Sequence, residues 1–237
     1  MKVIPLPFSS DLIKANLCGR KKVTRRPVKI PRGWQIHNGQ SARLELREDC
    51  GIELLNESDV TETRILLPPW SVNDLIWVKE TWGIIDGKVE EVNKHLSESE
   101  RAKQLVQNMK YGQSTYSGEV IYRSDGDFDW AKVCKMSKSM WKASMLMPRV
   151  ASRTTLRVTN VRAERLQSIT DEQALLEGMP CTQSQVRPRL WFKGIWDEIY
   201  NDWDCNPIVW VIEYDVINEN VDEVIERMKR THTNTCV

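Results

Sequence analysis

A run of basic residues near the N-terminus is the part of this sequence best suited to bind an anion. Between positions 14 and 32 the chain has no acid and eight basic residues: Lys14, Arg20, Lys21, Lys22, Arg25, Arg26, Lys29 and Arg32. A second segment, residues 132–165, carries nine basic residues and a single acid, Glu164. If folding brings both segments together, they form a positive surface suited to phosphates; solvated faces with locally paired charges are the alternative.

Other side chains could contact a nucleic acid or a base directly. Most of the ten tryptophans should lie in the core, but three are candidates to stack on a base: Trp34, Trp82 and Trp141. Four arginines are candidates for phosphate contacts: Arg149, Arg153, Arg157 and Arg162. Glu80 lies between the aromatic residues of the segment 77–82 and is a further carboxylate that could line the binding cleft.

Several common chemistries lack their motifs. Zinc-dependent deamination of a base needs a cysteine pair, and Cys181 has no second cysteine beside it. The three histidines, His37, His95 and His232, lie far from any cysteine cluster, so we expect no metal and no cofactor. The glycine-rich phosphate and dinucleotide loops and the serine nucleophile turn are absent from the sequence as well.

Composition indicates an ordinary globular chain. With 237 residues, 41% hydrophobic and 28% charged, it can bury one sizeable core, so we expect one domain with decoration over residues 1–215. No stretch is long and apolar enough for a membrane span or a secretory signal, which predicts a cytoplasmic protein without a membrane partner. The six cysteines are scattered, which favours reduced thiols.

Many short strands and a few helices must position these residues. Alternation and β-branched runs predict strands over residues 2–6, 42–55, 61–67, 75–82, 119–123, 154–161 and 208–212. Helices are predicted from Ser9 or Ser10 to Gly19, from the capping box at Thr170 to Gly178, over 191–200 and, in an acidic stretch, over 219–230, before a frayed polar tail.

Residues 87–112 are polar and rich in glutamate, lysine and glutamine, which predicts an inserted surface helix. The order of elements indicates an α+β, mainly β fold: a small β-barrel with short decorating helices.

The run Gly19-Arg20-Lys21-Lys22-Val23-Thr24-Arg25-Arg26 resembles the Gly-x-Lys-x-x-Thr-x-Arg signature of ASCH-domain proteins. Further segments are similar to the longer ASCH proteins of tailed bacteriophages: 77–82, 147–153, 161–166, 177–179 and 203–213. The resemblance covers about four fifths of the chain and leaves out residues 87–112 and the acidic tail. It implies a PUA-like barrel whose basic cleft binds RNA, single-stranded nucleic acid or a modified nucleoside, in the host cytoplasm if a phage encodes it.

One bacterial branch of this family is an amidohydrolase that removes the acetyl group from N4-acetylcytidine with a lysine, a threonine and a later glutamate. The matching positions here are Lys21, Thr24 and Glu177, so the resemblance implies that these three are catalytic. Such chemistry is sound: Thr24 could attack, Lys21 could act as base if its pKa is lowered, and Glu177 could orient it. Beside these three, the residues that we predict to bind substrate or nucleic acid are Arg20, Lys22, Arg25, Arg26, Trp82, Glu80, Arg149 and Arg153.

Three functions therefore remain open. The first is a binding module for RNA, single-stranded nucleic acid or a modified base; the second is an amidohydrolase of N4-acylated cytidine; the third and weakest is a ribonuclease. Lys21 and Thr24 are three positions apart, so a regular strand would point them to opposite faces, and the second function requires a turn or bulge at Lys22-Val23. Glu177, an acid in the last turn of a predicted helix, needs a partner to hold it there.

Overall fold

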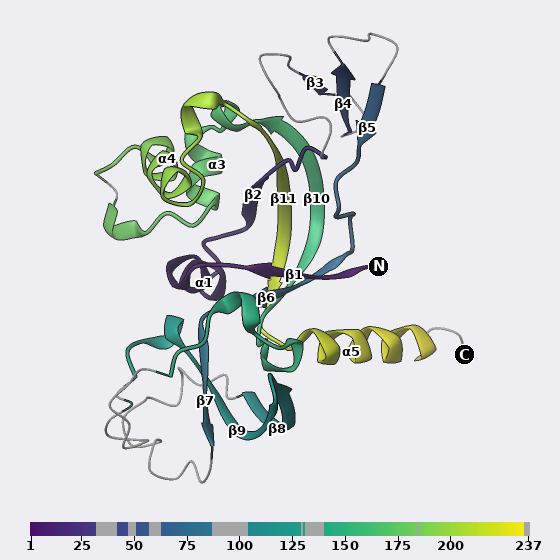
Figure 1. Ribbon diagram of the computed structural model, residues 1–237, viewed down its shortest axis with the longest axis vertical. Helices are drawn as coiled ribbons and strands as arrows, with labels where there is room; N and C mark the ends of the chain where they lie inside the picture. Colours follow the sequence, from purple (N-terminus) through teal and green to yellow (C-terminus); the bar gives the residue numbers. More distant parts are fainter. Residues whose placement is uncertain are drawn as a thin grey trace. The chain divides into compact units, whose positions relative to one another are not determined.

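The computed structural model describes residues 1–31, 42–46, 51–56, 63–86, 104–128, 130, 140–183 and 185–234. The described chain is an α+β protein built mostly of strands (Figure 1). It divides into two compact units whose segments alternate along the sequence. The first consists of Met1, Gly19–Asp74 and Val158–Asp215; the second consists of Lys2–Cys18, Leu75–Arg157 and Val216–Val237.

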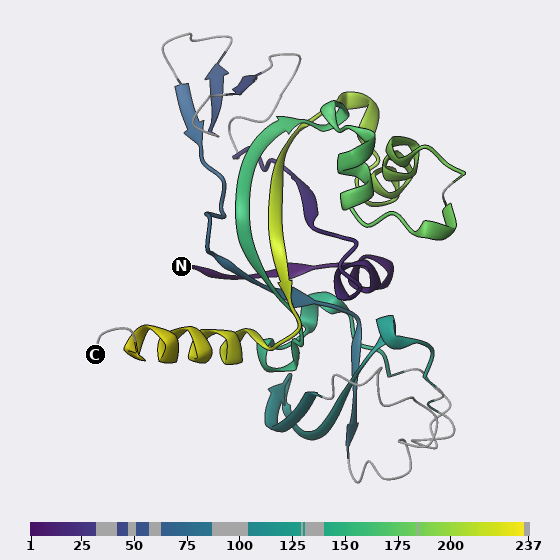
Figure 2. The same ribbon diagram turned by 180° about the vertical axis from the view of Figure 1, so that it is seen from behind.

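The main sheet of the first unit is formed by three strands: β2 (Val23–Pro27), β11 (Ile208–Ile217) and the part of β10 (Thr155–Arg165) that begins at Val158. β11 lies between β10 and β2 and runs antiparallel to β2. In both views β10 and β11 lie side by side as long curved strands (Figures 1 and 2). Residues 208–212 are all buried, which confirms the predicted central strand.

Two helices, α3 (Asp171–Leu176) and α4 (Pro188–Ile199), cover one face of this sheet (Figure 1). Their apolar side chains pack with those of β2 and β11 in one cluster: Val23, Leu166, Ile169, Ala174, Phe192, Trp196, Trp203, Val209 and Val211. Proline at the first helical position suits the start of α4, since it has no amide hydrogen to leave unpaired there. This packing fixes α3, and therefore the residue that follows it, against the start of β2.

The first unit also contains a three-stranded antiparallel meander of β3 (Ala42–Leu46), β4 (Ile52–Asn56) and β5 (Thr63–Leu66). The single alternating segment predicted over 42–55 is thus two strands of one hairpin. Alternation alone did not separate them, because the residues on both sides of the turn keep the same polar-apolar pattern.

In the second unit β1 (Val3–Pro7) pairs parallel with β6 (Leu75–Lys79), and β6 pairs antiparallel with the first three residues of β10. Helix α1 (Ser10–Leu17) follows β1, as predicted. The acidic helix is α5 (Val221–Asn234), whose Val221 and Val224 pack on Leu75 and Trp77. α5 continues four residues past the predicted end at 230, so the expected frayed tail is wrong for 231–234; residues 235–237 lie outside the described residues.

A second sheet in this unit consists of β7 (Trp82–Asp86), β9 (Ser114–Tyr122) and β8 (Gln104–Tyr111), in the order β7-β9-β8. The predicted helix over 87–112 is therefore wrong for its last third, and the rest of that range lies outside the described residues. Val106 and Met109 are both buried because a bulge with Asn108 at φ 52° interrupts the strand between them. The helix was predicted from the polar composition of the range, and composition does not reveal that 104–111 pairs with β9 as a strand.

The predicted closed barrel is also wrong: every sheet that the described strands form is open. Among these strands β1 pairs only with β6, and β2 pairs only with β11, so each keeps a free edge. A barrel has no edge strand. A list of strands and turns does not specify closure, which depends on register and strand tilt. Among the described helices, none has the length and apolar character needed to cross a membrane.

Candidate functional site

The backbone that carries Lys21 leaves helical geometry before it enters β2. Gly19 has φ +73°, a left-handed conformation that suits glycine after a helix. The amide of Lys22 donates to Leu176 O at 2.9 Å, and its carbonyl accepts from the amide of Tyr214 at 3.0 Å. β2 begins only at Val23. Strand alternation therefore does not govern Lys21, and the turn or bulge at Lys22-Val23 that would bring Lys21 and Thr24 together stays a prediction.

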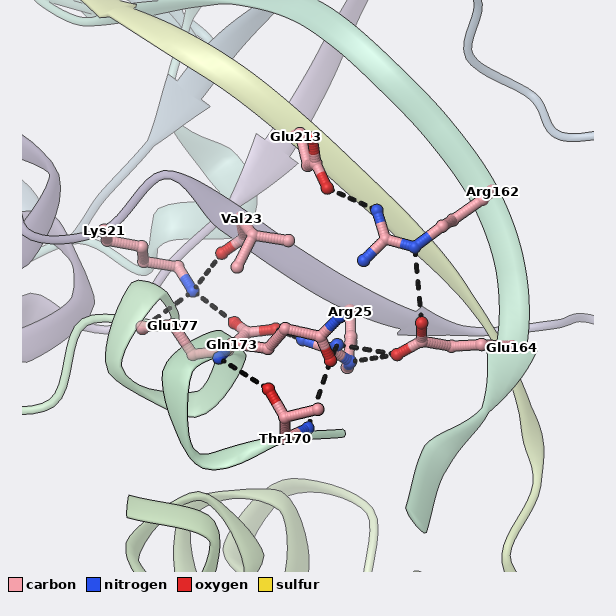
Figure 3. A network of polar contacts seen from close by, with 9 residues as sticks. All are labelled: Lys21, Val23, Arg25, Arg162, Glu164, Thr170, Gln173, Glu177 and Glu213. Carbon is pink, nitrogen blue, oxygen red and sulfur yellow. Dashed lines mark hydrogen bonds and ion pairs between the residues drawn. The ribbon is translucent and has the colours of Figure 1, made fainter. Parts of the chain in front are cut away.

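Lys21 and Glu177 form a buried ion pair although they lie far apart in the sequence (Figure 3). Lys21 is 1% exposed and Glu177 is 3% exposed. The Lys21 ammonium donates to Glu177 Oε2 at 2.6 Å, to the Glu177 carbonyl at 3.0 Å and to the Val23 carbonyl at 2.8 Å. These three acceptors match the three hydrogens of an ammonium group.

Glu177 is held at the C-terminal end of α3 by two cationic side chains. The helix starts with the predicted capping box, in which Thr170 and Gln173 exchange hydrogen bonds, and Glu177 is its C-terminal cap before Gly178, whose φ is +104°. Lys21 donates to the Glu177 carbonyl, and Arg20 Nη1 donates to the next two carbonyls, at 3.0 and 2.9 Å. These cations offset the negative end of the helix, so the position of an acid there is explained.

Arg25 joins Glu177 to β10. Its Nη1 donates to Glu177 Oε1 at 2.9 Å, while Nε and Nη2 donate to Glu164 Oε1 at 2.9 and 2.6 Å. Nη2 also donates to Gln173 Oε1 at 3.0 Å, and the guanidinium carbon lies 5.8 Å from the centre of the Phe192 ring. Arg25 was predicted to contact substrate. Its guanidinium instead binds two carboxylates and an amide of the protein itself.

The charged chain continues outward along β10 and β11 (Figure 3). Arg162 Nε lies 3.3 Å from Glu164 Oε2, and Arg162 Nη1 pairs with Glu213. Side-chain exposure increases along this path, from 0% at Arg25 through 15% and 28% to 42% at Glu213. We call the six residues the Lys21 network: Lys21, Glu177, Arg25, Glu164, Arg162 and Glu213.

The pKa of Lys21 is lowered. Burial is the largest cause, because it disfavours the charged amine; Glu177 opposes it, and the positive charges of Arg26 and Arg25 add to it. A lysine that gives up its proton more easily than usual can act as a general base. A buried base beside a fixed carboxylate is an arrangement suited to proton transfer.

Thr24 is buried on β2. Its backbone lies next to the Lys21–Glu177 pair, because Thr24 directly follows Val23, whose carbonyl accepts a hydrogen bond from Lys21. Alternation along β2 places its side chain on the face opposite Val23 and Arg25. The three residues matched to the amidohydrolase branch are thus all buried, and the described contacts join Lys21 to Glu177.

The remaining basic residues of the signature differ in their surroundings. Lys22 is exposed. Arg26 is half-buried, and its Nη1 donates to the Tyr200 hydroxyl at 3.4 Å. Arg20 is half-buried and bonded to the carbonyls that follow Glu177. Lys22 is therefore the basic residue of the signature most open to solvent.

Glu80 and Arg153 form a separate buried network in the second unit. Arg153 Nε lies 3.0 Å from Glu80 Oε1, and its Nη2 lies 2.6 Å from Asp125 Oδ1. Ser124 Oγ donates to Glu80 Oε2 at 2.5 Å, and the Arg153 guanidinium stacks 3.8 Å from the centre of the Tyr122 ring. The prediction that Arg153 contacts phosphate is wrong, because the side chain is buried and paired with two acids.

The tryptophans predicted to stack on a base differ in burial and packing. Trp82 is fully buried, 5.3 Å edge-to-face from Tyr111, so its predicted role at a cleft mouth is wrong. Trp141 is half-buried and packs edge-on against Trp130 at 5.3 Å. Trp34 lies outside the described residues.

Two further arginines were predicted to contact phosphate. Arg149 is half-buried and pairs with Asp222 at 2.5 Å, and Arg157 is exposed on β10. Within the described part of the chain, no group of three or more histidine, cysteine or acidic side chains is arranged to hold a metal ion.

Sequence reasoning missed the partners that hold these networks. Glu164 gave a signal, since it is the single acid in the basic segment 132–165, and a lone acid among arginines suggests a buried ion pair. Gln173 gave none beyond its capping box, and its second bond to Arg25 depends on tertiary packing. The serine and aspartate that bind Arg153 had no sequence signal either.

No family model matches the chain, and no curated protein or solved structure gives a significant match. Membership of the ASCH family remains a prediction from the motifs.

Proposed function

We propose that this chain is an ASCH-type, PUA-like protein that hydrolyses an N4-acylated cytosine nucleoside at the Lys21–Glu177 pair. The observation that carries the proposal is the 2.6 Å contact between the Lys21 ammonium and Glu177 Oε2. It joins the two residue types that the resemblance assigns to catalysis, across 156 positions of sequence. A pair that pointed to solvent would have removed the basis for an enzyme.

The local chemistry supports hydrolysis of an amide. A general base must be unprotonated when it acts, and the lowered pKa of Lys21, caused mainly by burial, favours that form. Glu177 keeps the amine oriented, and it can accept its proton because the contact is short. Positive charge from Arg25 and Arg26 lies close to Lys21 and favours a developing oxyanion nearby.

In the proposed reaction the nucleophile is the hydroxyl of Thr24 or a water molecule. As its oxygen bonds to the acyl carbon, its proton passes to the Lys21 amine. The carbon–nitrogen bond then breaks, and Lys21 returns the proton to the departing N4 amine. If Thr24 attacked, a water molecule hydrolyses the threonine ester in the same way. The products are a carboxylic acid and the cytosine nucleoside, and one water is consumed.

The buried arginines favour this function over a phosphate-binding cleft. Arg25 and Arg153, two of the residues predicted to bind substrate or nucleic acid, are paired with acids of the protein and are not exposed. A nucleic acid would have to displace these pairs, at the cost of leaving buried carboxylates alone. The binding module for RNA or single-stranded nucleic acid is therefore the second candidate, and it becomes the first if turnover is absent.

The test is chromatographic conversion of N4-acetylcytidine to cytidine by the purified chain. We expect Lys21→Met to lose about 10²–10⁴-fold of kcat/KM, the usual contribution of a general base. Lys229→Met, an exposed lysine on α5, is the matched control and should keep full activity. Thr24→Ala and Thr24→Ser separate the two nucleophiles: loss in alanine with recovery in serine assigns the attack to the hydroxyl.

Circular dichroism of every variant separates loss of chemistry from loss of fold. If the folded wild-type chain leaves N4-acetylcytidine and longer N4-acyl analogues intact, the proposal fails. Fluorescence anisotropy with single-stranded RNA then tests the binding module.

A further inference from the structure

Arg25 has the geometry of a residue that sets the orientation of another side chain. It is buried, and its donors reach three residues from two elements: Gln173 within α3, Glu177 at the C-terminal cap of α3, and Glu164 on β10. The two oxygens of Glu177 are divided between two cations, Oε2 with Lys21 and Oε1 with Arg25. Because both oxygens are engaged, the carboxylate cannot rotate without breaking a buried contact.

We propose that Arg25 is the positioning residue of the Lys21–Glu177 pair, and that Glu164 holds Arg25 in place. The inference rests on the proposed function and adds to it two residues outside the lysine, threonine and glutamate of the resemblance. A guanidinium suits this task, since its planar set of donors fixes direction as well as distance. Gln173 helps to hold the Arg25 guanidinium in place. Its Oε1 accepts hydrogen bonds from both Arg25 and the amide of Thr170, which ties Arg25 to the start of α3.

The Lys21 network does not conduct protons past Arg25. A guanidinium stays protonated, so Arg25 cannot take a proton from Glu177 and pass it to Glu164. Arg25 therefore acts through its charge and its fixed contacts. The charged groups that face Lys21 are Glu177 from α3 together with Arg25 and Arg26 from β2. Glu164 is the next charge, in contact with Arg25.

This arrangement predicts opposite effects for two neutralising substitutions. In Arg25→Gln a positive charge near Lys21 disappears, so the pKa of Lys21 rises. In Glu164→Gln the charge of Arg25 is less compensated, so the pKa of Lys21 falls further. A purely structural role for either residue would lower stability without moving this titration in opposite directions.

The experiment measures the Lys21 titration in two ways. The first is the acid limb of kcat/KM against pH for N4-acetylcytidine, which reports the base in the free enzyme. The second is the pH titration of the Lys21 ε-carbon by NMR in ¹³C-lysine-labelled protein, with Lys21→Met to assign the signal. We expect both to shift to higher pH in Arg25→Gln and to lower pH in Glu164→Gln. Arg165→Gln and Glu198→Gln, both exposed, are the matched controls and should shift neither.

Arg25→Lys keeps the charge but not the planar donors. We expect its titration to stay near that of the wild type while kcat falls by about 10²-fold, as when a reacting group is displaced by about an ångström. If Arg25→Gln does not fold, the activity of Arg25→Lys decides whether Arg25 orients Glu177 or only fills space beside it.

The outcomes separate the two proposals. Opposite NMR shifts without turnover would leave Arg25 as the positioning residue of the pair and reject the amidohydrolase. Unchanged NMR titrations, or shifts in the same direction, would reject the positioning role whether or not the wild type turns over. Full kcat in Arg25→Lys would also reject it.

Discussion

Each of the two units buries a network of charged side chains, and the networks differ in the cation at their centre. In the first unit Lys21 and Arg25 share Glu177, and in the second Arg153 is shared by Glu80 and Asp125. The networks have similar contact distances and similar burial at their centres. What each can do chemically follows from the difference between an amine and a guanidinium.

The arginine network keeps its charges fixed. Burial opposes the charged form of Arg153, but Glu80 and Asp125 outweigh it and raise its pKa. Glu80 in turn has a raised pKa, mainly because it is buried. Since Arg153 never loses its proton, it cannot itself act as a base, and it joins Glu80, which follows β6, to Ser124 and Asp125, which follow β9. Lys21 has a lowered pKa, so burial of a similar degree prepares it for proton transfer.

The largest expected effects come from replacing the two central cations by methionine. Arg153→Met leaves two carboxylates without their partner, and we expect a loss of about 3–5 kcal/mol of stability. Lys21→Met leaves Glu177 paired with Arg25, so we expect a smaller loss of stability but nearly complete loss of turnover. Urea unfolding and the N4-acetylcytidine assay, run on both variants, measure the two quantities.

The contrast between the two networks is wrong if Arg153→Met abolishes turnover and Lys21→Met does not. Folded Arg153→Met protein with no activity would place the chemistry in the second unit. Lys21→Met protein that turns over normally would make both networks structural.

Much of the fold could be predicted from the sequence. The capping box at Thr170 and the central strand at 208–212 depend on local pattern, and both were predicted. Local pattern failed at β8, where polar composition predicted a helix and the chain instead pairs with β9. It failed again for the barrel, because closure depends on pairing between distant strands.

The candidate site was predictable only in part. The signature motif identified Lys21, the similar segment 177–179 identified Glu177, and the structure brings the two residues together. Motifs could not tell which arginines are buried, because burial of Arg25 and Arg153 depends on acids that fold against them from other elements. Trp82 was assigned to a surface for the same reason: its place in a strand does not show which face of the sheet other elements cover.

Two glycines offer a smaller contrast between the units. Gly83 in the second unit lies under Trp130, and a Cβ there would meet the ring at 2.7 Å. That ring is packed between Phe128 and Trp141 and cannot withdraw easily, so we expect Gly83→Ala to lose about 1–3 kcal/mol. Gly194 within α4 has open space around its Cβ position, and Gly194→Ala should gain about 0.5–1 kcal/mol from helix propensity.

Thermal and urea unfolding of both glycine variants measure this difference. A stable Gly83→Ala protein would mean that the contact between β7 and Trp130 can open, and that the aromatic core of the second unit is less rigid than its packing indicates.

The smallest expected effect is on the slope of stability with pH, and it has opposite signs in the two networks. Stability rises with pH wherever the unfolded chain binds more protons than the folded one. The folded pKa of Lys21 lies below 10.5, so between that pKa and 10.5 the unfolded chain holds the extra proton and stability rises with pH. The folded pKa of Glu80 lies above 4.5, so between 4.5 and that pKa the folded chain holds the extra proton and stability falls as pH rises.

Urea unfolding across these two windows separates the contributions. Lys21→Met should flatten the rise on the alkaline side and leave the acid side unchanged, because the window of Lys21 ends at its unfolded pKa of 10.5 and does not include the window of Glu80. Glu80→Gln keeps the size and the hydrogen-bonding capacity of the side chain, and it should flatten the fall on the acid side alone. If Lys21→Met leaves the alkaline slope unchanged, the folded chain holds Lys21 charged as firmly as the unfolded chain does. A lysine held that way resembles Arg153 in function, and the distinction between the networks would then rest on the activity assay alone.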